Sequence, residues 1–167
     1  GYYWRAWNHH WMKALEPARA DINRAKALHA RADIYLLAGI IEYDQKDHTP
    51  ARADLNSSLQ MEGESCSAMW YLGLVYMDLK GFSESAKYFE FAMTCYERRV
   101  LFSEQELQAM QARTDLDAEF RTRQIEGFEA AIKEDRSQQY ASAFNAANHF
   151  AQAGNLDKAK PLLEISA

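Results

Sequence analysis

Two cysteines, Cys66 and Cys95, are the residues of this chain that can form a covalent cross-link, a disulfide. Two thiols are too few to specify a disulfide-rich scaffold. They form either one disulfide or two free thiols that pack as small apolar side chains. A disulfide would indicate an extracytoplasmic, oxidising compartment, whereas free thiols would indicate the cytoplasm. The choice depends on where the secondary structure places the two residues.

The adjacent histidines His9 and His10 are the next candidates, because histidine is a common metal ligand. Adjacent residues of a helix point about 100° apart, so they rarely bind one ion, and no cysteine or carboxylate spacing supports a metal site. The sequence contains no nucleophile motif and no glycine-rich phosphate loop. Its carboxylates lie beside lysines and arginines, as on solvated helix faces. We therefore predict a protein without metal, cofactor or catalytic activity.

The composition of the 167-residue chain is that of one ordinary globular domain, with 48% hydrophobic and 26% charged residues. The formal net charge of −5 argues against nucleic acid as a partner, which requires a basic face. No apolar run reaches the length of about 18 residues that suggests a transmembrane helix. The chain begins at Gly1 rather than at methionine, so the absence of a visible leader indicates nothing about its compartment.

A repeat in the first third of the chain indicates which elements must position these residues. The segment Pro17–Asn23 recurs as Pro50–Asn56 with a single change. Gly39 and Gly73 extend the pattern with nearly the same spacing. A fixed period of about 34 residues indicates stacked helical hairpins. Three prolines and seven glycines in the whole chain leave long stretches free to be helical.

Two segments carry a more specific pattern of large and small residues. The first runs Trp70-Tyr-Leu-Gly73-Leu-Val-Tyr76 and continues with Gly81, Ser85, Phe89 and Ala92. The second runs Phe144-Asn-Ala-Ala147-Asn-His-Phe150 and continues with Gly154, Ala159 and Leu163. With this pattern the chain resembles the tetratricopeptide repeat (TPR) family, whose unit of about 34 residues is a helix–turn–helix. Small residues allow the two helices to approach closely, and large residues fill the grooves between them.

The resemblance implies an all-α fold, a right-handed solenoid of about five antiparallel helical hairpins in a single TPR-like domain over residues 1–167. We expect the hairpins at approximately residues 1–30, 31–64, 65–98, 99–136 and 137–167. The fourth is irregular, because it has no turn glycine and no pair of small residues. It forms either one long helix or two shorter ones, and its only plausible break lies at Thr114-Asp115.

The third expected hairpin places the two cysteines. Cys66 would begin its first helix and Cys95 would end its second, with the turn near Gly81 between them. The two ends lie side by side in an antiparallel hairpin, so a disulfide is geometrically possible. It would close a loop of about 30 residues and stabilise the fold by about 3–4 kcal/mol, less any strain. Two buried free thiols remain the alternative.

The TPR resemblance also implies that the first helix of each hairpin lines a concave groove. The residues at the groove positions are Tyr3, Trp7, His10, Leu36, Ile40, Tyr43, Trp70, Leu74, Met77, Phe144 and Asn148. If the register differs by one residue, side chains such as Trp70 belong to the core instead. If instead these side chains are exposed, the groove is occupied either by a partner or by the irregular segment 99–136 of this chain.

An apolar, aromatic groove is typical of surfaces that bind other proteins. Some TPR domains bind carboxylate tails through lysines, but Leu36, Trp70 and Phe144 occupy those positions here, so we expect an apolar helical segment as the ligand. The predicted function is a protein-interaction scaffold or assembly subunit. The alternative is self-assembly into homo-oligomers or filaments through the aromatic N-terminus, residues 2–11, and an uncapped C-terminal hairpin. Two other interpretations of the aromatic N-terminus are contact with a membrane interface, and packing of its helix on the next hairpin with part of the aromatic surface exposed.

Overall fold

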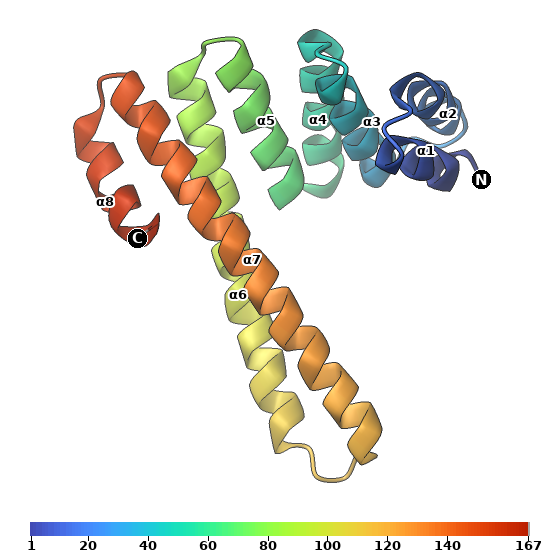
Figure 1. Ribbon diagram of the computed structural model, residues 1–167, viewed down its shortest axis with the longest axis vertical. Coiled ribbons are helices and arrows are strands. Elements are labelled where there is room, and N and C mark those ends of the chain that lie inside the picture. The colour runs from blue at the N-terminus through green and yellow to red at the C-terminus, as the bar shows by residue number, and fades with distance from the viewer. Residues whose placement is uncertain (167) are drawn as a thin grey trace.

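The computed structural model describes residues 1–166, and these residues form eight α-helices and no strand (Figure 1). The helices are α1 (Tyr2–Trp11), α2 (Leu15–Leu28), α3 (Ala32–Asp44), α4 (His48–Glu62), α5 (Cys66–Asp78), α6 (Phe82–Ala112), α7 (Ala118–Gln152) and α8 (Leu156–Ser166). Successive helices pair as the hairpins α1–α2, α3–α4, α5–α6 and α7–α8, and the hairpins follow one another in a row. None of the described helices is both long and apolar enough to cross a membrane.

The repeat in the sequence produces a repeated turn. Lys13, Lys46 and Lys80 have φ angles of 59°, 65° and 63°, and each lies between the two helices of its hairpin. The amide that follows each lysine donates a hydrogen bond to the carbonyl five residues earlier, as in the Schellman ending of a helix. Gly154, with φ of 80°, occupies the equivalent place between α7 and α8. The same local ending therefore reverses the chain in all four hairpins.

Neighbouring hairpins bury small, separate cores. One cluster joins α2 to α3 and includes Ile22, Leu37 and Ile41, which are at most 1% exposed. A second joins α4 to α5 around Leu55 and Leu72. Others lie further along the row, as between α6 and the pair α7–α8. Each hairpin is therefore held by its immediate neighbours, as in other repeat proteins.

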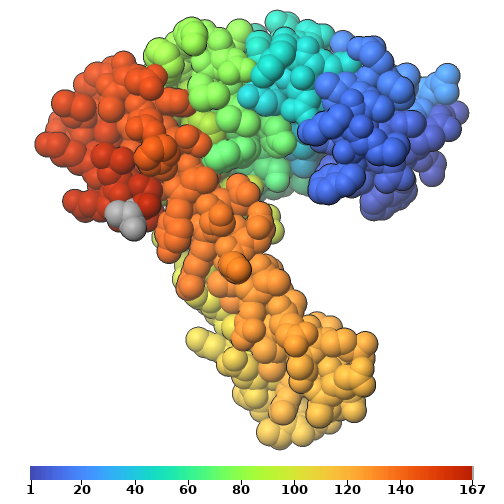
Figure 2. Space-filling model, in the orientation of Figure 1, coloured from blue at the N-terminus to red at the C-terminus, as the bar shows by residue number. Residues whose placement is uncertain are grey.

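Helices α6 and α7 continue far beyond the row. They are 31 and 35 residues long and run side by side into solvent, where they form a projection (Figures 1 and 2). We call residues 101–131 the arm. The loop at its tip, residues 113–117, is held by an ion pair of Arg113 with Asp115 at 2.6 Å, and the Asp117 carboxylate caps α7 by accepting from the amide of Phe120 at 3.0 Å.

The arm corrects the expected division of the chain. Residues 99–136 are not a separate hairpin, because α6 and α7 pass through the expected boundaries at residues 99 and 136 without a break. Nothing in this stretch ends a helix before the loop, since it contains no proline and its single glycine, Gly127, lies within α7. The residues Thr114 and Asp115, where the sequence indicates a break, do lie in the loop. The row therefore contains four hairpins instead of five.

Cys66 and Cys95 lie side by side near the base of the arm and form a disulfide in the structure, with 5.4 Å between their Cα atoms. Cys66 is the first residue of α5, as expected. Cys95 does not end its helix, because α6 continues to Ala112. The disulfide therefore ties the start of α5 to the middle of α6, close to the point where the arm leaves the row.

Candidate functional site

A hollow runs across the first helices of the hairpins and ends against the base of the arm. It consists of three adjoining cavities, all of which are lined in part by Ser67, near the start of α5. We name them the apolar cavity, the aromatic–acidic cavity and the disulfide cavity. Because they share wall residues, they form one continuous depression in the surface.

The apolar cavity has a volume of about 340 Å³ and lies between α1, α3 and α5. Tyr3 and Trp7 are four residues apart and therefore share one face of α1. Opposite them, Leu36 and Ile40 share one face of α3 in the same way. The complete lining is Tyr3, Trp7, Asp33, Leu36, Leu37, Ile40, Ser67 and Tyr71. Trp7 remains 40% exposed, so a large aromatic surface is open to a ligand at this end of the hollow.

The aromatic–acidic cavity has a volume of about 300 Å³ and lies between α5, α6 and α7. Its lining combines three aromatic rings with charged and polar side chains: Ser67, Trp70, Tyr71, Tyr96, Arg99, Glu134, Asp135 and Gln138. Trp70 is held by an edge-to-face contact with Phe89, with 5.0 Å between the ring centroids. A rigid aromatic wall thus faces carboxylates from α7.

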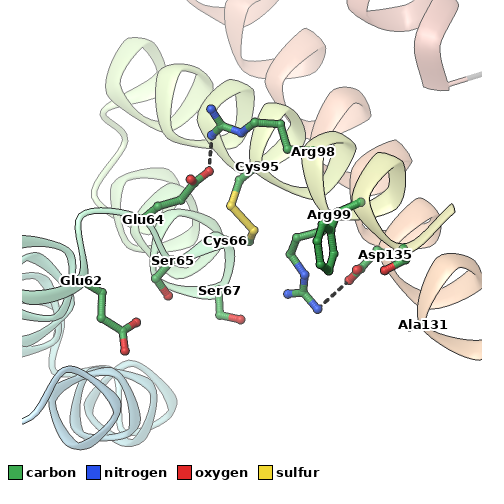
Figure 3. Close-up of a pocket in the computed structure, with 12 residues that line it drawn as sticks. Glu62, Glu64, Ser65, Cys66, Ser67, Cys95, Arg98, Arg99, Ala131 and Asp135 are labelled. Carbon is green, nitrogen blue, oxygen red and sulfur yellow. Dashed lines mark hydrogen bonds and ion pairs between the residues drawn. A yellow bond between two sulfur atoms is a disulfide. The ribbon is translucent and has the colours of Figure 1, made fainter. Parts of the chain in front are cut away.

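The disulfide cavity has a volume of about 540 Å³ and lies in the angle between the row and the arm. Figure 3 shows the disulfide between two ion pairs, Glu64 with Arg98 and Arg99 with Asp135. The Arg99 Nη2 atom lies 3.1 Å from Asp135 Oδ1. Phe102 and Ala131 contribute the wall from the base of the arm. The long helices α6 and α7 therefore complete a site that α1, α3 and α5 begin.

Burial controls the titration of the groups in the hollow. Asp135 is 3% exposed, and this burial raises its pKa, although Arg99 acts in the opposite direction. Burial likewise raises the pKa of the Tyr71 and Tyr96 hydroxyls, so both are neutral near pH 7. At neutral pH the tyrosines therefore offer uncharged rings and hydroxyl groups to a ligand.

The structure brings five of the eleven expected groove residues to the hollow. Four of them, Tyr3, Trp7, Leu36 and Ile40, line the apolar cavity. The fifth, Trp70, lines the aromatic–acidic cavity with part of its surface and packs on the core through Phe89 with the rest. One side of the Trp70 ring therefore faces the hollow, as the groove interpretation expects, and the other side packs on the core.

The other six expected residues are not among those that line the hollow. The imidazole of His10 lies 2.7 Å from Asp44, and Tyr43 packs edge-to-face on Tyr71 with 5.7 Å between the ring centroids. Leu74 packs against the core cluster of α6, α7 and α8. The remaining three are the half-buried Met77 and Asn148 and the 51% exposed Phe144.

The important residues absent from the sequence-based prediction come from two places. Ser67 and Tyr71 lie four residues apart on α5, so the face of that helix toward the hollow includes them as well as Trp70. Asp33 and Leu37 occupy the equivalent positions on α3 and also line the hollow. An alignment of the two repeats therefore identifies Ser67 and Tyr71 as residues of the same face. Arg99, Glu134, Asp135 and Gln138 come from α6 and α7, and no local pattern indicates that these helices close the hollow.

The two adjacent histidines face different partners. His9 Nε2 lies 3.7 Å from Asp21 on α2, and His10 Nε2 lies 2.7 Å from Asp44 on α3. Among residues 1–166 no group of three or more histidine, cysteine, aspartate or glutamate side chains is arranged to hold a metal ion. The histidine pair is explained by its contacts with these carboxylates.

Comparisons with known proteins find similarity at the level of structure. No family model matches the sequence, and no curated protein matches it. The crystal structure of YrrB, described as a TPR protein with an unusual peptide-binding site, is 20% identical in sequence and has a TM-score of 0.53; the match covers 99% of this chain and 82% of that one. The crystal structure of MamA is 10% identical with a TM-score of 0.51, covering 95% of this chain and 90% of that one. These matches and the repeated hairpins show that the chain has the fold of the tetratricopeptide repeat proteins.

Proposed function

We propose that the protein is a non-catalytic scaffold that binds another protein, and that the hollow holds an apolar, helical segment of that partner. The observation that carries this proposal is the apolar cavity, in which the 40% exposed Trp7 stands beside Tyr3, Leu36 and Ile40. Concave sites lined by aromatic and aliphatic side chains bind amphipathic helices through a few large anchors. The peptide-binding site described for YrrB, which has the same fold, is consistent with such a role.

Trp7 offers a direct test with a matched control on the same helix. Trp4 is 66% exposed and does not line the hollow, whereas Trp7 does. Helical peptides are selected from a displayed random library against the wild-type protein, and their dissociation constants are measured by fluorescence anisotropy. We expect Trp7→Ala to weaken the selected peptides at least about tenfold, as for a central aromatic anchor, and Trp4→Ala to leave them nearly unchanged.

The opposite result has a clear meaning. Peptides that bind Trp7→Ala as well as the wild type would show that the apolar cavity is not the binding site. Circular dichroism of both variants separates loss of binding from loss of fold, and we expect the same helical signal because neither ring belongs to the buried core.

Self-association through α1 is the second candidate, because Trp4 and Trp11 are 66% and 77% exposed. Large exposed aromatic side chains on one short helix are typical of surfaces that contact another chain. Light scattering over a range of protein concentrations tests this role. A mass that stays at one chain at high concentration would exclude it.

The disulfide between Cys66 and Cys95 also indicates the kind of compartment in which the protein is found. We propose an extracytoplasmic location, because disulfides persist in oxidising compartments and are rare in the cytoplasm. The intact mass of the native protein after alkylation without reductant tests the bond: no added alkyl group is expected, and two would contradict the proposal.

A further inference from the structure

We infer that the aromatic–acidic cavity binds a basic side chain, arginine or lysine, carried by the partner segment. This inference rests on the proposed function, because it assigns a second anchor of the same ligand. It divides the hollow into an apolar cavity for an apolar anchor and an adjoining cavity for a cation.

The composition of the cavity wall is suited to a cation. Trp70, Tyr71 and Tyr96 supply aromatic rings, whose faces attract ammonium and guanidinium groups. Glu134 and Asp135 supply carboxylates, which bind such groups through charge-assisted hydrogen bonds. A purely apolar ligand would cover the Glu134 carboxylate without giving it a charged partner, so the wall favours a ligand with a positive charge.

The chain already holds one guanidinium in this cavity. Arg99 Cζ lies 5.7 Å from the centroid of the Tyr96 ring, and Arg99 Nη2 lies 3.1 Å from Asp135 Oδ1. The Arg99 side chain is 56% exposed, so it occupies the rim more than the interior. It engages Tyr96 and Asp135, which leaves the surfaces of Trp70 and Tyr71 and the carboxylate of Glu134 for a second cation.

The charges around the whole hollow support the same partner chemistry. Five carboxylates line it, those of Asp33, Glu62, Glu64, Glu134 and Asp135. Three of them are paired within the chain, Asp33 with Arg31, Glu64 with Arg98 and Asp135 with Arg99. Among the described residues no cation pairs with Glu62 or Glu134, and Glu134 accepts a hydrogen bond from the amide of Gln138 at 3.1 Å. The hollow thus carries a negative surplus that complements a basic segment and repels an acidic one.

The two cavities also determine the spacing of the anchors. They share Ser67 and Tyr71, which lie one turn apart on α5. A helical segment that crosses both must present its apolar anchor and its basic residue on one face. Residues three or four apart share a face, so we expect a separation of about one to two helical turns.

Glu134→Gln tests the inference, and Glu126→Gln is the matched control. Both glutamates are exposed residues of α7, and both changes remove one negative charge with little change of shape, but only Glu134 lines the hollow. The probe is a helical peptide selected from the random library against the wild-type protein, together with a copy in which its basic residue is replaced by glutamine. Dissociation constants are measured by fluorescence anisotropy at low and at physiological salt.

We expect the selected peptides to carry an arginine or lysine beside their apolar anchor. Glu134→Gln should weaken the basic peptide about tenfold and reduce the salt dependence of its binding, because one charge-assisted contact is lost. The same variant should bind the glutamine peptide as the wild type does, and Glu126→Gln should bind both peptides as the wild type does.

The two proposals fail in different ways. Selected peptides that lack a basic residue, or that bind Glu134→Gln as tightly as wild type, would overturn the inference that this cavity binds a cation. If the same peptides are weakened by Trp7→Ala, the proposed function is still supported. A basic peptide that is insensitive to Trp7→Ala would overturn the apolar groove. Failure to select any peptide that depends on either residue would overturn both.

Discussion

At the scale of single residues, the repeated segment shows how one position takes on different chemistry. Asp21 and Asp54 occupy the same place in its two copies. Arg5 Nε and Nη2 both donate to Asp21 at 2.5 Å, so this buried carboxylate has a bidentate cation partner. Asp54 instead has Lys26 from the preceding hairpin and lies near a second acid, Glu42. The same residue therefore belongs to a balanced pair in one hairpin and to a crowded acidic site in the next.

Glu42 is the group on which this crowding acts. It is 4% exposed, and its Oε2 atom has no hydrogen-bond partner. Burial is the largest cause that raises its pKa to about 7, and the nearby Asp54 adds to the effect. Lys26 and Arg19 oppose the shift, whereas Asp47 reinforces it. The folded protein therefore holds a proton on Glu42 at a pH where the unfolded chain has released it.

This shift predicts how stability changes with pH. The folded pKa of Glu42 is raised, so its contribution is fully present below its unfolded pKa of about 4.5 and is lost as the pH rises through about 7. We expect Glu42→Gln, which cannot ionise, to remove part of the decline in melting temperature between about pH 4.5 and pH 7, the window between the unfolded and folded pKa values of Glu42. Thermal unfolding followed by circular dichroism measures it, with the exposed Glu126→Gln as control. An unchanged decline in Glu42→Gln would show that the folded protein does not raise the pKa of Glu42.

At the scale of helices, close approach within the second and third hairpins requires the absence of a side chain. A Cβ atom added to Gly73 would lie 2.9 Å from three carbons of the Phe89 ring, which is fully buried. Gly39 has the same relation to Leu55 in the second hairpin. Gly127, which also lies inside a helix, would place a Cβ atom in open space. The three glycines thus differ in what surrounds them, although all are helical.

The same substitution should therefore have opposite effects at two of these positions. Gly73→Ala should destabilise the protein by about 1–3 kcal/mol, because the added methyl displaces a large buried ring. Gly127→Ala should stabilise α7 by about 0.5–1 kcal/mol, because alanine loses less conformational entropy in a helix. Urea unfolding measures both changes. A stabilised Gly73→Ala variant would mean that the Phe89 ring moves aside at no cost.

At the scale of the whole molecule, the row and the arm are built differently. The row buries a core between each pair of neighbouring hairpins. None of residues 101–131, all of which the structure describes, is buried. Phe102 and Phe120 are 63% and 44% exposed. The arm is therefore two extended helices in contact with each other, and it adds little to the burial that stabilises the row.

Shortening the arm should leave the row folded. We expect a variant in which residues 105–130 are replaced by a short glycine-containing turn to lose helical signal but to keep its melting temperature within a few degrees of the wild type, because the hairpin interfaces remain. Circular dichroism measures both quantities, and the retained Phe102 and Ala131 keep the wall of the disulfide cavity. A fall of more than about 10 °C would show that the arm stabilises the row, since about 1 kcal/mol shifts the melting temperature of a domain of this size by roughly 2–4 °C.

The repeat made much of the architecture predictable from the sequence. Two copies of one segment at a repeat-like spacing, and small residues such as Gly39 and Gly73 opposite Leu55 and Phe89, are sufficient to indicate stacked hairpins. These signals are local or recur at a fixed period. The apolar half of the hollow follows from them, because the helix faces that include Tyr3, Trp7, Leu36 and Ile40 repeat with the hairpins.

The other half of the hollow was decided only by the tertiary structure. Long and short helices have the same local propensities, so no residue near position 99 shows that α6 continues to Ala112 or that α7 has already begun at Ala118. Arg99 and Asp135 are distant in the sequence and meet because these two helices run antiparallel from one loop. Their meeting point depends on the lengths of both helices at once. A repeat period contains no information about such a pair, whereas the packed fold brings it to the wall of the site.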